Sequence, residues 1–195
     1  MPKNEIITPT DLQAFAKERF EGRFEVNVIV GKTYIFPIGR DTYSPEPDVA
    51  VGPFAIEEEE YGNTYNEMAR SSKNFIEKCI KAHIINLRKY EINLGELPKF
   101  DFFCDRAINW NARCFIAVEV ENKPPSRKHL LGSTINAVAL GRVGLLVGFS
   151  EEVVIKFLRC LKYLNFLKSV KKSSIEFKNG LVLSKDRFIE ILEGI

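Results

Sequence analysis

Several features that would assign this chain to a familiar class are missing from its sequence. The four cysteines, at positions 79, 104, 114 and 160, form no Cys-x-x-Cys pair, so reduced thiols are favoured over a disulfide framework. No apolar run approaches the length of a membrane span, and the first residues lack the apolar core of a signal peptide. We therefore expect a cytoplasmic protein without a membrane partner.

Two common catalytic motifs and a dominant charge are also absent. The sequence has no Gly-x-x-x-x-Gly-Lys-[Ser/Thr] phosphate loop, which argues against ATP use, and no Gly-x-Ser-x-Gly elbow, which argues against an esterase. Lys and Arg number 28 and Asp and Glu 26, for a net charge of +2. The totals therefore do not predict nucleic acid, and only local clustering of charge could do so.

The chain has the composition of an ordinary globular domain. It has 195 residues, of which 45% are hydrophobic and 28% charged. Strand-like and helix-like patterns alternate along it, and this order predicts an α/β fold with a central mixed β-sheet flanked by helices. We expect one domain over residues 1–195, with residues 57–113 forming a mostly helical insertion between core strands.

The expected elements follow from apolar periodicity, helix caps and turn residues. Helices are predicted after Thr8, from about residue 64, and over 126–140, 150–170 and 184 onward. Strands are predicted at 24–30, 33–36, 49–51, 115–123 and 143–149, with a hairpin over 175–183 around Lys178-Asn179-Gly180.

The most unusual stretch is the predicted strand that leads from Phe115 to Lys123. Side chains alternate between the two faces of a strand, so Glu119, Glu121 and Lys123 should share one face of an otherwise apolar segment. Burying such charges is costly unless they pair or bind a cation. Pro124-Pro125 ends the strand, because proline cannot continue the hydrogen-bonded ladder.

A second acidic residue stands at the start of a neighbouring strand. Pro47-Asp48 opens the apolar run 49–51. Carboxylates that converge from adjacent strands suit Mg²⁺, which prefers hard oxygen ligands, and the carbonyl of Asn122 could add one more. A bound metal lowers the pKa of a water and neutralises phosphate charge, while Lys123 could orient that water.

Pro47-Asp48 and Glu121-x-Lys123, together with the element order from Thr8 to Phe149, resemble the PD-(D/E)xK nuclease superfamily. The resemblance implies a restriction-endonuclease-like fold and a Mg²⁺-dependent deoxyribonuclease, of restriction or repair type, that leaves a 5′-phosphate. Mn²⁺ should substitute for Mg²⁺. Asp48 and Glu121 would bind the metal and Lys123 would assist catalysis. The protein could form a homodimer or bind a partner subunit.

Residues near these positions have further expected roles. Glu119 should support Lys123 from deeper in the sheet. Arg127, Lys128 and His129 begin the next helix, whose N-terminus favours anions, so they are candidates for contact with the nucleic-acid backbone. Glu18 could add an acid from the first helix, although a solvated position fits it better.

Other interpretations remain open at this point. The fold could serve a nucleic-acid-binding or scaffolding subunit that does not cleave, or Glu119 and Glu121 could do acid-base work on a small molecule. Cys79 and His83 share an apolar helical stripe, which favours core packing over a zinc site. Three basic residues on a later helix, Lys156, Arg159 and Lys162, are expected to form a solvated face.

Overall fold

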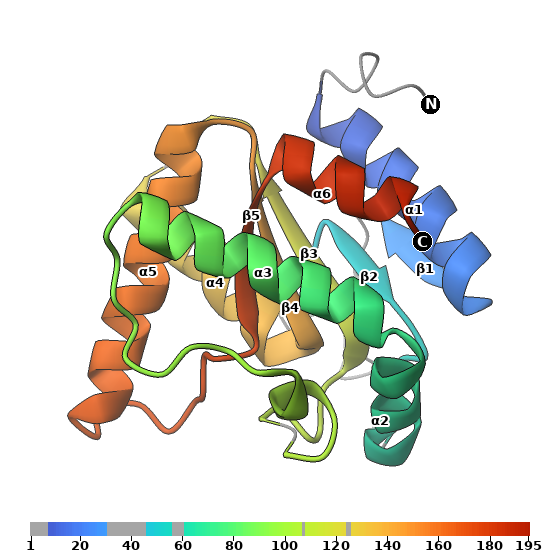
Figure 1. Cartoon of the computed structure of the whole chain (residues 1–195), viewed down its shortest axis with the longest axis horizontal. Helices are drawn as coiled ribbons and strands as arrows, with labels where there is room; N and C mark the ends of the chain where they lie inside the picture. The colour runs from blue at the N-terminus through green and yellow to red at the C-terminus, as the bar shows by residue number, and fades with distance from the viewer. Residues whose placement is uncertain (1–7, 31–45, 56–60, 107, 124–125) are drawn as a thin grey trace, which may run out of the picture.

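The chain forms an α/β domain in which a five-stranded mixed sheet is flanked by helices, as the sequence predicts (Figure 1). A computed structural model describes residues 8–30, 46–55, 61–106, 108–123 and 126–195. None of the helices in these ranges combines the length and the apolarity that crossing a membrane requires.

The strands lie in the sheet in the order in which they occur in the chain. They are β1 (Val28–Val30), β2 (Val49–Val51), β3 (Cys114–Glu121), β4 (Gly141–Gly148) and β5 (Gly180–Ser184). Strands β1, β2 and β3 pair antiparallel, whereas β3, β4 and β5 run parallel. The short antiparallel strands therefore bring the start of β2 to the end of β3.

Helices cover both faces of this sheet and differ in their packing partners. They are α1 (Pro9–Phe24), α2 (Gly62–Ser71), α3 (Lys73–Lys89), α4 (Arg127–Leu140), α5 (Glu151–Ser169) and α6 (Lys185–Glu193), with a 3₁₀ turn at Phe100–Phe103. The aromatic side chains of α1, α3 and α6 share one core with the sheet. Helices α4 and α5 pack on the opposite face (Figure 1).

The caps that were expected at three helix starts are present. Thr8 and Asp11 form a capping box at α1. The side chain of Ser126 accepts a hydrogen bond from the His129 N–H, and Ser150 caps α5 in the same way. These caps fix where α4 and α5 begin, directly after the strands that lead into them.

The first predicted strand is shorter than expected. Helix α1 continues through Phe24 and ends at Glu25, whose φ of 54° is left-handed, so only Val28–Val30 remains of the strand predicted at 24–30. The strand predicted at 33–36 lies outside the described residues.

The hairpin predicted over residues 175–183 is wrong. Residues 180–184 form β5, which pairs parallel with β4, and 175–177 form no strand. Asn179 is buried and its Nδ2 donates to the carbonyls of Val138 and Gly141, at 2.9 and 3.0 Å. The turn-like sequence thus ties the end of α4 to β5, because a buried amide needs partners.

Buried Arg142, at the start of β4, holds together the segment between β2 and β3. Its guanidinium donates to the Asn66 side chain at 2.8 Å and to the Trp110 carbonyl at 3.0 Å. It also lies over the rings of Tyr65 and Trp110, at 5.6 and 5.5 Å from their centroids. The long predicted helix is divided at Ser72 into α2 and α3, which follow one another here.

Candidate active site

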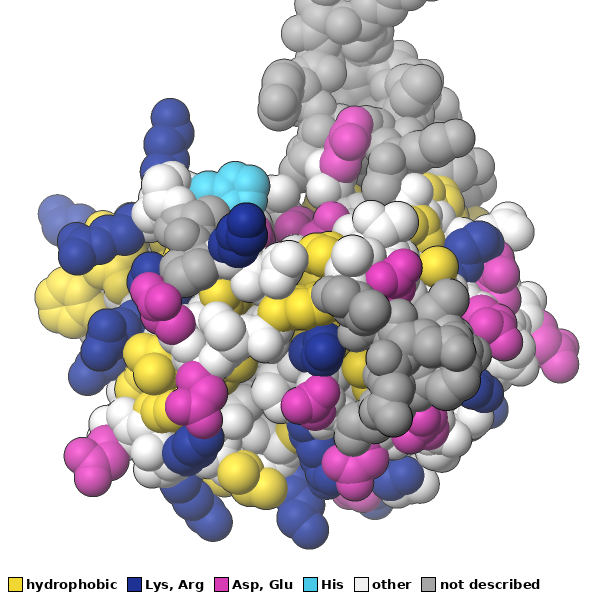
Figure 2. All heavy atoms as spheres, turned by 90° about the horizontal axis from the view of Figure 1, so that it is seen from above, with side chains coloured by type: hydrophobic (Ala, Val, Ile, Leu, Met, Phe, Trp, Pro, Cys, Tyr) yellow, Lys and Arg dark blue, Asp and Glu magenta, His cyan; other side chains and the backbone are white. Residues whose placement is uncertain are grey.

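A cleft of about 580 Å³ opens where β3 ends and α4 begins. Its acidic lining comes from the two antiparallel strands and the residues before them, namely Glu46, Asp48, Glu119 and Glu121. Its opposite wall comes from α4 and its cap, through Ser126, Lys128, His129, Gly132, Ser133 and Asn136. From above, the exposed histidine lies beside Lys and Arg side chains with acidic side chains next to it (Figure 2).

Asp48 is held at the start of β2 by two hydrogen bonds. Its Oδ2 accepts from the backbone N–H of Val120 at 2.7 Å, and its Oδ1 accepts from Nε2 of Gln13 at 2.8 Å. Burial raises the pKa of the Asp48 carboxyl, the Val120 N–H opposes this, and the negative charge of Glu121 raises it further. The carboxylate is thus held in position close to a second acid.

Glu119 lies directly beside Asp48. The β2–β3 register pairs Val49 with Val118, so continuing it by one residue places Asp48 opposite Glu119. Glu119 is only 6% exposed, and its Oε1 has no hydrogen-bond partner in the described residues. Burial, followed by the charge of Asp48, raises the pKa of Glu119 to about 9, against a hydrogen bond from Asn136 that lowers it.

Glu121 ends β3 and is oriented by α4. Its Oε1 accepts a hydrogen bond from Oγ of Ser133 at 3.0 Å and lies 2.9 Å from Nε2 of His129. The imidazole of His129, which was expected to contact nucleic acid, therefore contacts an acidic residue of the cleft. Its side chain remains 61% exposed, whereas that of Glu121 is 14% exposed.

The structure does not bring Lys123 into the cleft. Strand β3 ends at Glu121, so the alternation expected to align Lys123 with the glutamates does not extend to it. Lys123, Asn122 and Arg127 are exposed and are not among the described residues that line the cleft. Glu18 is likewise exposed on α1 and outside that lining.

Three residues that hold the acids were not predicted from the sequence, namely Gln13, Ser133 and Asn136. The last two could have been found, because His129, Ser133 and Asn136 are spaced by four and three residues. This spacing puts them on one face of the apolar helix α4. Gln13 carries no comparable pattern, since only the packing of α1 against the sheet brings it to Asp48.

The described side chains of the cleft offer the type of ligand atom that a divalent cation prefers, but they are not grouped closely enough to hold one. Asp48, Glu119 and Glu121 offer hard carboxylate oxygens of the kind that Mg²⁺ prefers, and Oε1 of Glu119 is unpartnered in the described part of the chain. Among the described residues, however, no three or more His, Cys, Asp or Glu side chains are grouped closely enough to hold a metal. The side chains would have to close around an ion.

Cys79 and His83 belong to the core. Both are fully buried on α3, and burial raises the pKa of the Cys79 thiol. Nδ1 of His83 accepts a hydrogen bond from the Val182 N–H at 3.0 Å, and burial lowers the pKa of the imidazole to about 4. These contacts tie α3 to β5 and agree with the expectation of core packing.

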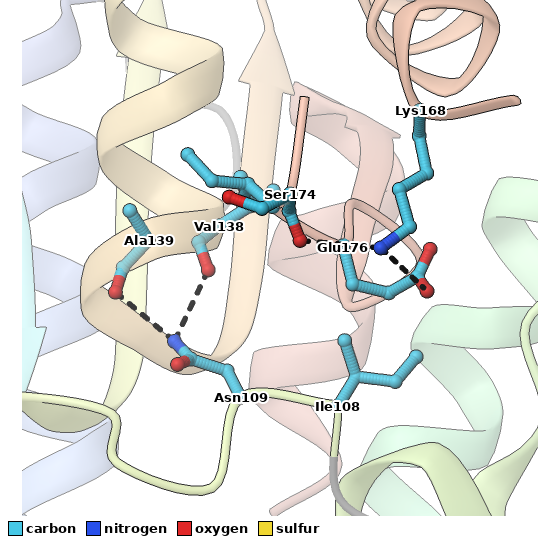
Figure 3. Close-up of a pocket in the computed structure, with 8 residues that line it drawn as sticks. Ile108, Asn109, Val138, Ala139, Lys168, Ser174 and Glu176 are labelled. Carbon is cyan, nitrogen blue, oxygen red and sulfur yellow. Dashed lines mark hydrogen bonds and ion pairs between the residues drawn. The ribbon is translucent and has the colours of Figure 1, made fainter. Parts of the chain in front are cut away.

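A second hollow, of about 520 Å³, lies at the far end of α4 (Figure 3). Nδ2 of Asn109 donates to the carbonyls of Val138 and Ala139, at 3.2 and 3.0 Å. Nζ of Lys168 donates to the Ser174 carbonyl at 3.2 Å and lies 4.0 Å from Glu176. Its polar groups are therefore engaged in joining the segments around Asn109 and Ser174 to α4 and α5, and the carboxylate cleft is the stronger candidate site.

Comparisons with protein-family models, with curated proteins and with solved structures returned no match to this chain. The chemistry of the cleft is therefore inferred from its own residues.

Proposed function

We propose that this chain is a divalent-metal-dependent nuclease that hydrolyses phosphodiester bonds of DNA. The observation that carries the proposal is the meeting of Asp48, Glu119 and Glu121 in one cleft, at the start of a helix with basic side chains. The PD-(D/E)xK resemblance of Pro47-Asp48 and Glu121-x-Lys123 gives the same class of reaction.

The chain's own residues would hold the acids in position for the reaction. The Val120 N–H and Gln13 fix Asp48, while Ser133 and His129 fix Glu121. Such fixed carboxylates lose little freedom on binding a cation. A bound Mg²⁺ or Mn²⁺ would supply an acidified water and charge neutralisation at the phosphate.

The substrate phosphate would lie on the α4 side of the cleft. Lys128 lines the cleft and sits in the first turn of α4. Helix N-termini present free N–H groups and a positive dipole end, which favour an anion. The acidic wall and this basic wall face each other, so a phosphodiester held by one is close to the carboxylates of the other.

A second candidate is a nucleic-acid-binding subunit that does not cleave. It is favoured by the position of Lys123, which the resemblance makes catalytic but which is exposed and outside the described lining of the cleft. In this case the acids would bind a cation or remain protonated without activating water.

The test is DNA cleavage by the full chain in Mg²⁺, in Mn²⁺ and in excess chelator. We expect cleavage only with metal, and at least about a hundredfold loss in Asp48→Asn and Glu121→Gln, because each removes a charged metal ligand. Thermal melting of each variant separates loss of activity from loss of fold.

Glu18→Gln is the matched control, since it removes an exposed carboxylate of α1 that lies outside the cleft. It should cleave like the unaltered chain. Full activity in excess chelator, or full activity of folded Asp48→Asn, would contradict the proposal. Metal-dependent nucleic-acid binding without cleavage would favour the second candidate.

A further inference from the structure

The near-neutral total charge hides one strongly basic segment. Residues 153–175 contain six Lys or Arg and no Asp or Glu, which leaves 22 basic and 26 acidic residues elsewhere in the chain. Most of this segment is helix α5. Positive charge concentrated on one helix favours a surface that binds a polyanion over a face that is only solvated.

Five exposed side chains of this segment lie on one stripe of the helix and just beyond its end. Each has another member three or four residues away, and we call them the α5 strip: Arg159, Lys162, Tyr163, Phe166 and Val170. Tyr163 is 51% exposed, Phe166 58% and Val170 44%. The opposite side of α5 is buried against the sheet and α4.

The cations of the α5 strip are available, unlike their neighbours. Lys156 pairs with Glu152 at 2.7 Å, and Lys168 lies 4.0 Å from Glu176. Arg159 and Lys162 form no ion pair within the described part of the chain. Two aromatic rings thus lie exposed next to two uncompensated positive charges, and on this side of the molecule hydrophobic side chains lie among Lys and Arg (Figure 2).

We propose that the α5 strip binds single-stranded nucleic acid. Aromatic rings stack on unpaired bases without regard to sequence, and neighbouring Lys and Arg neutralise the phosphates. From Arg159 to Val170 the stripe extends about 16 Å at the rise of a helix, which is enough for several nucleotides. The two cations at one end of the strip lie next to the two rings, so phosphates and bases of one strand can be contacted together.

Other occupants fit these side chains less well. A duplex hides the faces of its bases, so Tyr163 and Phe166 would stay exposed. A second copy of the chain would bring two basic strips together, which like-charge repulsion opposes.

The inference does not rest on the proposed nuclease activity. The strip lies on the outer face of α5, whereas the cleft lies between β3 and the first turns of α4. The strip would bind a single strand whether or not the cleft hydrolyses it. Binding and cleavage can therefore be measured, and can fail, separately.

The experiment measures binding of a fluorescent oligothymidylate of about 20 nucleotides to the full chain in excess chelator, where metal-dependent cleavage is blocked. Tyr163→Ala/Phe166→Ala should weaken binding at least about tenfold, because two stacking platforms are removed. Lys162→Glu should also weaken it and reduce the salt dependence by about 0.7 in the log–log slope for each phosphate that is no longer neutralised.

Ile85→Ala and Lys81→Glu are the matched controls, since both positions are exposed on α3, away from the α5 strip. They should bind like the unaltered chain. Equal affinity in Tyr163→Ala/Phe166→Ala overturns the inference. It is also overturned if a duplex of the same length binds more tightly, or if the strip variants lose binding only to phosphatidylserine vesicles.

Discussion

Two buried ionisable side chains at opposite ends of the β3–β4 pair differ in how the protein treats their charge. Arg142, at the start of β4, is fully buried and donates to carbonyl or amide oxygens of Asn66, Phe103, Gly62 and Trp110. Glu119, near the end of β3, is almost as buried, but its hydrogen bond is to Asn136 and its Oε1 has no partner in the described residues, where the Nε of Arg142 also has none.

The difference sets the protonation state of each group. Burial lowers the pKa of Arg142 only to about 10, so the guanidinium stays charged at neutral pH. Burial and the charge of Asp48 raise the pKa of Glu119 to about 9, so this carboxyl is protonated there. The charge of Arg142 is stabilised by hydrogen bonds within the chain, whereas the charge of Glu119 can be neutralised by a proton or a bound cation.

The largest effect is expected from removing Arg142. Arg142→Met leaves the carbonyls of Gly62 and Trp110 without their donor and frees the segment between β2 and β3. We expect a loss of about 3 kcal/mol or more in the free energy of unfolding, as for other broken buried charge networks. Denaturant unfolding followed by circular dichroism measures it.

Arg70→Met is the control for that substitution, because Arg70 pairs with Asp105 at the surface. Its unfolding midpoint should stay nearly unchanged. An equally stable Arg142→Met variant would show that Arg142 does not hold the segment in place.

The next effect concerns Glu119 and pH. Its folded pKa of about 9 lies above the value near 4.5 of an exposed glutamate, so the folded state binds the proton more tightly. Its contribution to stability is therefore present at low pH and is lost as pH rises from about 4.5 to about 9. Glu119→Gln, which cannot ionise, should gain stability relative to the unaltered chain, by up to about 4 kcal/mol, between about pH 5 and about pH 8.

Urea unfolding of both proteins across this pH range is the measurement, with Glu18→Gln alongside. The difference between Glu18→Gln and the unaltered chain should be independent of pH. A Glu119→Gln difference that is equally flat would mean that Glu119 is ionised in the folded protein.

A metal ion is expected to bind at the end of the β3–β4 pair that carries Glu119 and not at the end that carries Arg142. If the cleft binds Mg²⁺, the ion displaces protons from Asp48 and Glu119, so binding strengthens as pH rises. At about a hundred times its dissociation constant, Mg²⁺ should stabilise the chain by about 2.7 kcal/mol at most. The melting temperature should rise in the unaltered chain and in Glu18→Gln but not in Asp48→Asn; an equal rise in Asp48→Asn would place the ion elsewhere.

The smallest effect is expected at Ser133. Ser133→Ala removes the hydroxyl that donates to Glu121 but leaves His129 in place. Stability should fall by about 1 kcal/mol or less, and the cleavage rate should fall more than stability alone explains. Thermal melting and cleavage assays on the same preparation separate these effects. An unchanged rate would show that His129 alone orients Glu121.

The local sequence was sufficient where neighbouring residues decide the structure. Ser126 and Ser150 cap the helices that were predicted to begin at them, because a cap bonds to an N–H only three residues away, whereas Ser184, which was expected to cap α6, makes no side-chain cap hydrogen bond. The alternation within Cys114–Glu121 placed Glu119 and Glu121 on one face, where both line the cleft. Lys123 was predicted to share this face but does not line the cleft, because the alternation of side chains ends where β3 ends, at Glu121.

The sequence by itself determined the α/β class, the starts of α1, α4, α5 and α6, and the pairing of an acidic strand with Pro47-Asp48, because these follow from periodicity and caps within short windows. Only the tertiary structure decided that Gln13 holds Asp48, that residues 180–184 join the sheet parallel to β4, and that Arg142 anchors a segment far from it in sequence. These contacts join residues with no shared local pattern, and packing around the sheet alone brings them within hydrogen-bonding distance.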